Sequence, residues 1–233
     1  MSGAENINRK NYCDGMRDAI PIALGYLAVA FTLGIAARNA GVHALPATIM
    51  SLTNTTSAGE FAAITAIAGG VGYAELALMQ LVINLRYMLM SCALTQKLDP
   101  KFSIIHRFFI GFGVTDEIFG ISVARKGKLN PCYMYGAMSI AIPAWTIGTC
   151  LGVVLGNVLP GGVVSALSVA LYGMFLAIII PPARDNKVIR GLVIIAMAAS
   201  FLFTKIPVIK NISSGMKVII LTVVISAVAA VLF

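Results

Sequence analysis

The sequence predicts an all-helical, polytopic membrane protein, and three observations lead to that prediction. Hydrophobic residues make up 59% of the 233-residue chain and charged residues only 11%. Soluble domains carry about 25% charged residues, so this composition argues against a soluble globule. The mean hydropathy is +0.92. The apolar residues also form long runs, as membrane helices require, and not the alternating segments of a β-barrel.

Eight apolar runs approach the length of a bilayer span, about 17 to 25 residues. Only short joints separate them, which leaves no room for a soluble catalytic domain. We therefore expect a polar N-terminal segment at 1–18 and one helical transmembrane transport domain at 19–233, with seven or eight hydrophobic segments. The runs lie at 19–37, 44–68, 73–94, 102–124, 132–156, 163–183, 188–204 and 216–233.

The run at 44–68 differs from the others because it contains a dense group of polar side chains. Backbone that leaves the helical pattern is tolerated at membrane depth only inside protein or beside a wet cavity, as in transporter substrate sites. We expect this run to be broken or re-entrant. The alternative is a continuous helix whose hydroxyls bond to the preceding turn. The group comprises Ser51, Thr53, Asn54, Thr55, Thr56 and Ser57.

The formal net charge of +8 does not indicate a nucleic-acid partner, because the basic residues form short clusters between the apolar runs. Eight spans with the N-terminus inside would place nine basic residues inside and seven outside. That difference is too small to fix the orientation. An inverted-repeat protein would show such a balance, although no clear internal repeat is visible in the sequence.

The four cysteines form no CxxC pair and have no histidine at ligand spacing, so the sequence predicts neither a metal site nor a cofactor. A phosphate-binding loop is also missing from the sequence, because Ser122 stands where Gly127-Lys128 would need a glycine. With no nucleophile and base pair in evidence, the sequence predicts a protein that is not an enzyme.

Four charged residues lie deep within the apolar runs: Glu60, Arg86, Asp116 and Glu117. Each costs about 2.5 to 3.5 kcal/mol at the centre of a membrane helix, so such residues usually have a function. Arg86 can neutralise one of the three carboxylates. The others must be protonated, bind a cation or lie in water. The alternative is an ion-pair lock between helices with no role in transport.

The residue types predict distinct roles for these charges. Arg86, near Asn84, can hold the carboxylate of a substrate, of Asp116 or of Glu60. Adjacent helical residues diverge by about 100°, so Asp116 and Glu117 must face different partners. One could bind a substrate ammonium group and the other a coupling proton. Trp145, the only tryptophan, lies in mid-span and either lines a cavity or packs in the core.

Several motifs together resemble the AzlC family. The motifs are Asp14-x3-Asp18-x2-Pro21-x3-Gly25, Ala58-Gly59-Glu60-Phe61, Asn84-Leu85-Arg86-Tyr87, Thr115-Asp116-Glu117 and Trp145-x2-Gly148-Thr149-x2-Gly152. The resemblance covers about residues 12–200. It implies the large subunit of a two-component exporter of branched-chain amino acids, paired with a small AzlD-type membrane protein. Family members usually have glutamine in place of Glu60 and histidine in place of Tyr87.

The leading hypothesis is a multi-pass transporter of the cell membrane that exports small, branched-chain-like amino acids with the proton gradient. Arg86, Asn84 and the polar second run (Ser51, Asn54 and Thr55) would receive the substrate carboxylate, and Asp116 its ammonium group. Trp145 would line the site. Glu117 or Glu60 would carry the coupling proton. The alternative is a non-transporting assembly subunit whose buried charges lock it to a partner protein.

Overall fold

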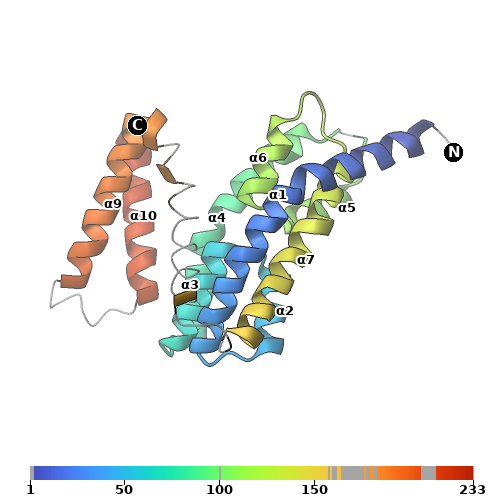
Figure 1. Ribbon diagram of the computed structural model, residues 1–233. Helices are drawn as coiled ribbons and strands as arrows, with labels where there is room; N and C mark the ends of the chain where they lie inside the picture. Colours follow the sequence, from blue (N-terminus) through green and yellow to red (C-terminus); the bar gives the residue numbers. More distant parts are fainter. Residues whose placement is uncertain are drawn as a thin grey trace.

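The protein folds into α-helices that lie close to parallel or antiparallel to one another (Figure 1). The computed structural model describes residues 3–99, 101–156, 158, 162–163, 176, 179–180, 183–205 and 214–232. Most of the predicted span at 163–183 lies outside the described residues. The helices are α1 (Gly3–Asn39), α2 (Ala44–Asn54), α3 (Ser57–Ala68), α4 (Tyr73–Lys97), α5 (Ile104–Phe112), α6 (Asp116–Ala124), α7 (Pro131–Leu155), α9 (Lys187–Lys205) and α10 (Ser214–Leu232).

Three of the described helices, α1, α4 and α7, are long and apolar enough to cross a membrane. The prediction of a helical membrane protein is thus confirmed. Helix α1 has 37 residues, about 55 Å at 1.5 Å per residue, which exceeds the hydrocarbon core of about 30 Å. It runs without interruption from the polar N-terminal segment into the first apolar run, so that segment is helical from Gly3 onward.

The second apolar run is broken, as the sequence predicts. Helix α2 ends at Asn54, and α3 begins at Ser57. Thr55 has a φ of 29°, a left-handed conformation that a β-branched residue rarely adopts. The Thr56 side chain caps α3 by accepting a hydrogen bond from Gly59 N at 3.4 Å. Each half spans about 17 Å, roughly half of the bilayer core.

The fourth apolar run, 102–124, is also broken, although the sequence predicts one continuous span there. Helix α5 ends at Phe112, followed by Gly113, and α6 begins at Asp116. Thr115 caps α6, because its side chain accepts a hydrogen bond from Ile118 N at 3.3 Å. With nine residues each, α5 and α6 span only about 14 Å.

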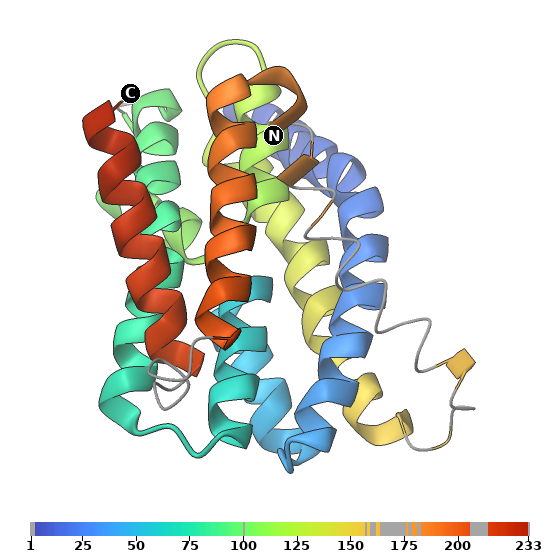
Figure 2. The ribbon, with the colours of Figure 1, turned by 90° about the vertical axis from the view of Figure 1, so that its left-hand side faces the viewer.

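The two broken pairs enter the bundle from opposite ends (Figures 1 and 2). Lys97 at the end of α4 bonds to the Arg125 carbonyl oxygen after α6, and Arg125 pairs with Asp14 on the first half of α1. This end, called here the N-terminal end, is where α5 begins and α6 finishes. Helices α2 and α3 begin and finish at the opposite end, where α1 finishes and α4 begins. Both pairs are therefore re-entrant hairpins.

The hairpins give the chain an inverted arrangement that the sequence does not reveal. Helix α1 crosses in one direction and is followed by the α2–α3 hairpin. Helix α4 crosses in the other direction and is followed by the α5–α6 hairpin. This is the geometry of inverted repeats in transporters, whose interrupted helices meet near the bilayer midplane.

Helices α1 and α7 pack with almost no space between their backbones. A Cβ atom at Gly136 would lie 2.0 Å from the Tyr12 carbonyl oxygen, and one at Gly152 would lie 2.0 Å from that of Phe31. Gly15 and Gly34 on α1 meet the α7 backbone in the same way. Small residues allow such close approach of membrane helices. The pair supplies much of the buried core, including Leu33 and Tyr133.

Helices α9 and α10 lie on the side of α4 and are antiparallel to each other (Figure 2). Helix α10 contacts α4, α9 and α3. Its first turn is fixed to the start of α4, because Met216 N donates a hydrogen bond to Glu75 Oε1 at 3.0 Å. These helices do not contribute to the pocket described next.

Candidate functional site

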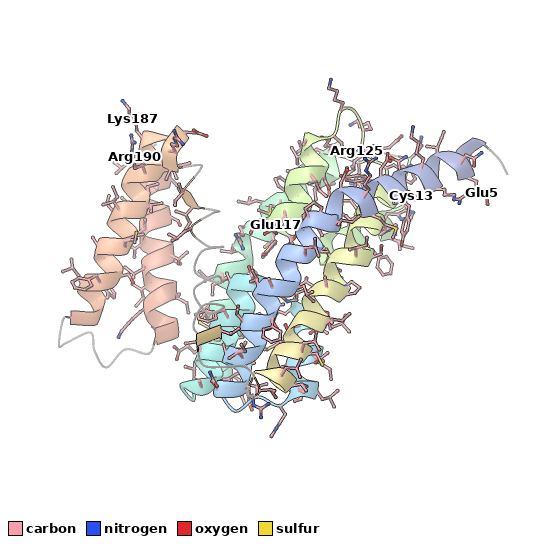
Figure 3. The ribbon with its side chains drawn as sticks, in the orientation of Figure 1. Glu5, Cys13, Glu117, Arg125, Lys187 and Arg190 are labelled. Atoms are coloured by element: carbon pink, nitrogen blue, oxygen red, sulfur yellow. The ribbon has the colours of Figure 1, made fainter. Side chains whose placement is uncertain are left out.

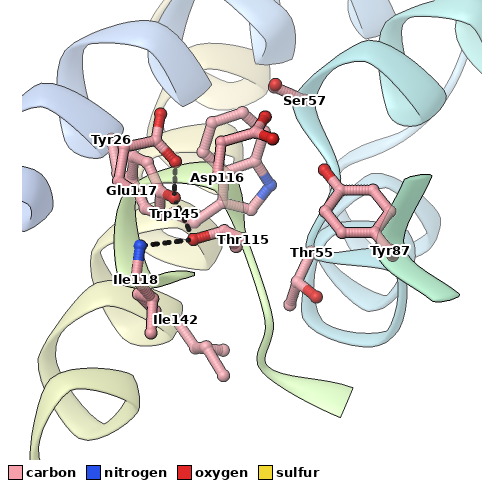
Figure 4. Close-up of a pocket in the computed structure, with 10 residues that line it drawn as sticks. All are labelled: Tyr26, Thr55, Ser57, Tyr87, Thr115, Asp116, Glu117, Ile118, Ile142 and Trp145. Atoms are coloured by element: carbon pink, nitrogen blue, oxygen red, sulfur yellow. Dashed lines mark hydrogen bonds between the residues drawn. The ribbon is translucent and has the colours of Figure 1, made fainter. Parts of the chain in front are cut away.

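The breaks of the two hairpins contact each other. The Thr55 hydroxyl, at the end of α2, donates a hydrogen bond to the Phe112 carbonyl oxygen, at the end of α5, at 3.3 Å. A pocket beside this contact has a volume of about 10 Å³, enough for one water molecule. Its lining residues are Tyr26, Thr55, Ser57, Tyr87, Thr115, Asp116, Glu117, Ile118, Ile142 and Trp145 (Figure 4).

Two helices start at this pocket, α3 at Ser57 and α6 at Asp116. The N-terminus of a helix carries about half a positive charge and several free N–H groups. The half-helix termini therefore favour negative charge at one place, as in transporters that bind a substrate carboxylate. Asp116 and Glu117 lie in the first turn of α6, where the helix dipole stabilises their carboxylates.

Asp116 forms an ion pair with Arg86 across the pocket wall. Arg86 Nη1 lies 2.8 Å from Asp116 Oδ2, and the two side chains are 35% and 19% exposed. Arg86 Nη2 also donates a hydrogen bond to the Tyr87 hydroxyl at 3.0 Å. Of the three partners that the sequence allows for Arg86, the structure therefore shows Asp116.

Glu117 faces α1 instead, as the divergence of adjacent helical residues requires. Its Oε2 atom lies 2.5 Å from the Tyr26 hydroxyl, which is 2.6 Å from Thr115 Oγ1. A phenol has one proton, so Tyr26 donates to the carboxylate while the Thr115 hydroxyl completes the network (Figure 4). Arg86 balances only one of the two acids, and the pocket keeps an acidic excess.

Glu60 belongs to a second cluster, which is fully buried. It lies on α3, and its carboxylate is bonded to the Ser51 hydroxyl of α2 and accepts a hydrogen bond from Trp145 Nε1 of α7 at 2.8 Å. Ser51 also bonds to Thr149 Oγ1 at 2.7 Å. Trp145 connects the clusters, because it lines the pocket and contacts the Tyr26 ring edge-on at a centroid distance of 5.4 Å.

The residues predicted from the sequence thus occupy different places. Thr55, Asp116, Glu117 and Trp145 line the pocket, and Arg86 borders it through Asp116. Asn84 holds the start of α3, since its Oδ1 accepts a hydrogen bond from the Thr56 hydroxyl at 3.1 Å. Ser51 and Glu60 form the buried cluster, and Asn54 is the half-buried last residue of α2, outside the pocket lining.

Six pocket residues are not among the predicted site residues: Tyr26, Ser57, Tyr87, Thr115, Ile118 and Ile142. A signal for Thr115 is present in the sequence. A threonine followed by two acids is typical of a helix N-terminus, and Gly113 just before it is a turn signal. Tyr26 carries no such signal, because its partner Glu117 is 91 residues away.

Within the described ranges, no group of three or more His, Cys, Asp or Glu side chains is arranged to hold a metal ion. The side chains that line the pocket offer hydrogen bonds, charge and apolar contacts. Arg86 and the helix termini can bind a carboxylate, Asp116 and Glu117 an ammonium group, and Ile118 and Ile142 a small apolar side chain.

Comparisons with known proteins agree on one family. The family model described as "AzlC protein" matches residues 21–159. A membrane protein of Archaeoglobus fulgidus is 32% identical over 176 residues, which are 75% of this chain and 77% of the relative. The inner membrane protein YgaZ of Escherichia coli is 25% identical over 206 residues, or 84% of each chain. No solved structure matches the chain.

Proposed function

The chain belongs to the AzlC family of membrane proteins, and from this premise we propose that it is a secondary transporter. It exports small, branched-chain-like amino acids across the cell membrane and is coupled to the proton gradient. One observation carries the proposal: two half-length hairpins enter from opposite ends and meet at a pocket lined by two acids, one of which is paired with an arginine. Discontinuous helices of this kind form the substrate sites of secondary transporters.

The two charges of the Arg86–Asp116 ion pair are complementary to the carboxylate and the ammonium group of a zwitterionic amino acid. An amino acid inserted between them offers a carboxylate to Arg86 and an ammonium group to Asp116, so each charge exchanges one partner for another. The Thr55 hydroxyl and the N-terminus of α3 lie beside the carboxylate position, and Asn84 keeps Thr56 in place at that terminus. Ile118 and Ile142 would face the aliphatic side chain.

The closed pocket implies movement during the cycle. Its volume of about 10 Å³ admits one water, whereas an amino acid is several times larger. Substrate entry therefore requires one hairpin to separate from the other. The two hairpins enter from opposite ends, so moving one of them opens the pocket to one side of the membrane only. Glu117 or Glu60 would carry the proton that couples this movement to the gradient.

The hairpins change how the basic residues are distributed between the two ends of the bundle, and we infer that the N-terminal end is cytoplasmic. Because both hairpins return to the end they entered from, nine basic residues between 3 and 156 lie towards this end and only Arg38 at the other. Cytoplasmic loops carry the excess of Lys and Arg. Lys187 and Arg190 lie at the same end as Arg125 (Figure 3), whereas Lys205 at the end of α9 and Lys217 in the first turn of α10 lie at the opposite end. The nine residues are Arg9, Lys10, Arg17, Lys97, Lys101, Arg107, Arg125, Lys126 and Lys128.

A vesicle assay tests the transport proposal. Vesicles loaded with radiolabelled valine are given an imposed proton gradient, and efflux is followed for the wild type and for Arg86→Gln and Asp116→Asn. We expect efflux from wild-type vesicles and its loss in both variants. Full activity in both variants would remove the basis of the proposed site. We also propose that the chain pairs with a small AzlD-type membrane subunit. This subunit is supplied by co-expression, and its recovery with the purified chain tests the pairing.

The assembly-subunit alternative is favoured by one observation, the closed state of the pocket around its ion pair. In that case the charges would only hold helices together or bind a partner protein. The alternative predicts that Asp116→Asn and Arg86→Gln no longer bind the partner protein. The transporter proposal predicts folded, partner-bound variants that do not transport. Co-purification of the same two variants with the partner protein distinguishes these outcomes.

A further inference from the structure

The Glu60 cluster shares Trp145 with the substrate pocket, but its carboxylate lies outside the pocket lining, and the burial of that carboxylate needs an explanation of its own. Glu60, Ser51 and Thr149 are 0% exposed, and Trp145 is 3% exposed. Glu60 is not among the pocket-lining residues. In the part of the chain that the structure describes, its carboxylate bonds to Ser51 and Trp145 and to no cationic side chain. An isolated buried carboxylate is costly unless it is protonated or paired.

We propose that the Glu60–Ser51–Thr149–Trp145 cluster is the proton-binding site of the transport cycle and that it is occupied by a proton in this closed state. The proposal rests on the proposed function and makes it more specific. It assigns the coupling proton to Glu60, while Glu117 remains part of the substrate pocket.

The hydrogen bonds of the cluster satisfy the protonated form completely. Protonated Glu60 donates from Oε1 to Ser51 Oγ, Ser51 donates to Thr149 Oγ1, and Thr149 donates to the Trp145 carbonyl oxygen at 3.3 Å. Trp145 Nε1 donates to the other carboxyl oxygen of Glu60. The chain of donors thus begins and ends on the same tryptophan, with no buried polar group left unpaired.

The same residues also tolerate the ionised form. Rotation of the Ser51 hydroxyl makes Ser51 a donor to Glu60 instead of to Thr149, and Thr149 keeps its bond to the Trp145 carbonyl oxygen. Glu60 lies in the first turn of α3, where the helix dipole partly offsets a negative charge. One hydroxyl rotation therefore connects the two protonation states, as a site that must load and release a proton requires.

A proton fits this cluster better than a metal cation does. The Trp145 N–H group occupies one carboxyl oxygen of Glu60 and directs its positive end toward the site. Hard cations such as Ca²⁺ and Mg²⁺ take about six or more oxygen ligands. The cluster offers fewer, namely one carboxylate, two hydroxyls and a carbonyl, and its hydroxyls already bond to each other at 2.7 Å.

Several titratable side chains on the surrounding helices bond to groups other than Glu60. On α1, Tyr26 bonds to Glu117, and Arg38 bonds to the Val153 carbonyl oxygen. On α4, Arg86 bonds to Asp116 and Tyr87, Tyr87 also bonds to Thr56, and Glu75 bonds to Met216 N. Helix α10, which carries Lys217, meets α3 in a cluster containing Ile219 and Ala66. None of these side chains bonds to Glu60, so the proton of the cluster itself is bound by Glu60, whose partners Ser51 and Trp145 do not titrate near neutral pH.

The cluster is positioned to couple the proton to the pocket. Its bonds join α2 to α3 through Ser51 and Glu60, and join both to α7 through Thr149 and Trp145. Loss of the proton leaves a buried anion that water stabilises better than the two hydrogen bonds of the cluster do, which favours opening of the α2–α3 hairpin. Trp145 passes the change to the substrate side, since its ring contacts Tyr26, the hydrogen-bond partner of Glu117.

Infrared spectroscopy of the reconstituted protein tests the proton directly. At neutral pH we expect a protonated carboxyl C=O band that disappears in Glu60→Gln and remains in Glu75→Gln, the matched control on α4. In Trp145→Phe, which lacks the N–H donor, the band should shift to higher frequency. A wild-type band that Glu60→Gln leaves unchanged, or no band at all, would overturn the proposal.

Transport provides the second measurement, with the ratio of valine efflux in the presence and absence of a proton gradient as the readout. This ratio should fall to unity in Glu60→Gln and stay at the wild-type value in Glu75→Gln. A wild-type ratio in Glu60→Gln would contradict the coupling role. If wild-type vesicles release no amino acid, the proposed function fails, and the infrared experiment still decides whether Glu60 holds a proton.

Discussion

Thr55 and Phe112 are 57 residues apart in sequence, yet a hydrogen bond joins the Thr55 hydroxyl to the Phe112 carbonyl oxygen at 3.3 Å. Each lies at the end of the first half of a broken helix pair. The bond ties the tip of one hairpin to the tip of the other and satisfies a carbonyl group that the end of α5 leaves without a helical partner. Opening the pocket toward either side requires this bond to break.

Thr55→Val should lower the stability of the closed state, because it keeps the branched shape but removes the hydroxyl. A lost hydrogen bond of this kind costs about 1 kcal/mol. The matched control is Thr55→Ser, which keeps the donor and relieves branching at a φ of 29°, so its stability should equal or exceed that of the wild type. Thermal unfolding in detergent measures both. Equal midpoints for the valine and serine variants would show that the bond contributes nothing.

The pair of Arg86 and Asp116 should show strong coupling in stability. Each single neutralisation, Arg86→Gln or Asp116→Asn, leaves a partly buried charge without its partner and should lower the unfolding midpoint. The double variant removes both charges and should recover most of the loss, while valine efflux stays absent. A double variant that is as unstable as the sum of the single variants would mean that the two residues act independently.

Tyr26→Phe should slow transport without unfolding the protein. It removes the donor that faces Glu117, and a hydrogen bond to a charged group contributes about 1.5 to 3 kcal/mol, equivalent to a loss of tenfold or more. The matched control is Tyr133→Phe, which removes a phenol bonded to Asp18 at 2.8 Å near the N-terminal end. Valine efflux at equal protein levels is the measurement. Equal rates in the two variants would exclude a special role for Tyr26.

Cysteine labelling can test the orientation, because Cys13 is exposed on the first half of α1. In a chain carrying Cys92→Ala, Cys132→Ala and Cys150→Ala, a membrane-impermeant maleimide added to intact spheroplasts should leave Cys13 unlabelled. It should label Cys13 after permeabilisation. His43→Cys on a Cys13→Ala background provides the opposite control, since His43 lies at the other end of the bundle. Labelling of Cys13 in intact cells would reverse the inferred orientation.

Gly136→Ala should destabilise the protein strongly, since its Cβ atom would lie 2.0 Å from the Tyr12 carbonyl oxygen. Overpacking of this kind costs about 1 to 3 kcal/mol. Gly120→Ala on α6 is the matched control, because no atom lies within 4 Å of its added Cβ. Alanine is favoured over glycine in helices by about 1 kcal/mol, so this variant should be at least as stable as the wild type. Unfolding midpoints compare the two.

The fold was predictable wherever the sequence pattern is local. Long apolar runs predict the crossing helices, and six polar residues in seven positions predict a break in the second run, which the structure places at Thr55 and Thr56. The second break was not predicted, because Gly113 and Thr115 are embedded in an apolar run whose total length matches a full span. If the fourth run is taken as one full span, the basic residues fall almost evenly on the two sides of the membrane. The sequence then gives no orientation.

The sequence predicts the deep charged residues near the candidate site, but neither most of its remaining lining nor its arrangement. The cost of burying charge singles out Glu60, Arg86, Asp116 and Glu117, and helical geometry separates the directions of the two adjacent acids. Which partner each acid meets depends on contacts between distant helices, such as that of Glu117 with Tyr26. No spacing in the sequence encodes such a contact. The division into a pocket and a separate buried cluster therefore required the structure.

The glycine contacts between α1 and α7 have a consequence for the mechanics of the molecule. Backbones that touch at Gly15, Gly34, Gly136 and Gly152 cannot slide or turn past one another, because any shift would bring side chains into spaces that hold none. Helices α1 and α7 therefore behave as one rigid unit, against which the shorter helices can move. In the proposed transport cycle, the half-length hairpins therefore move while α1 and α7 stay in place.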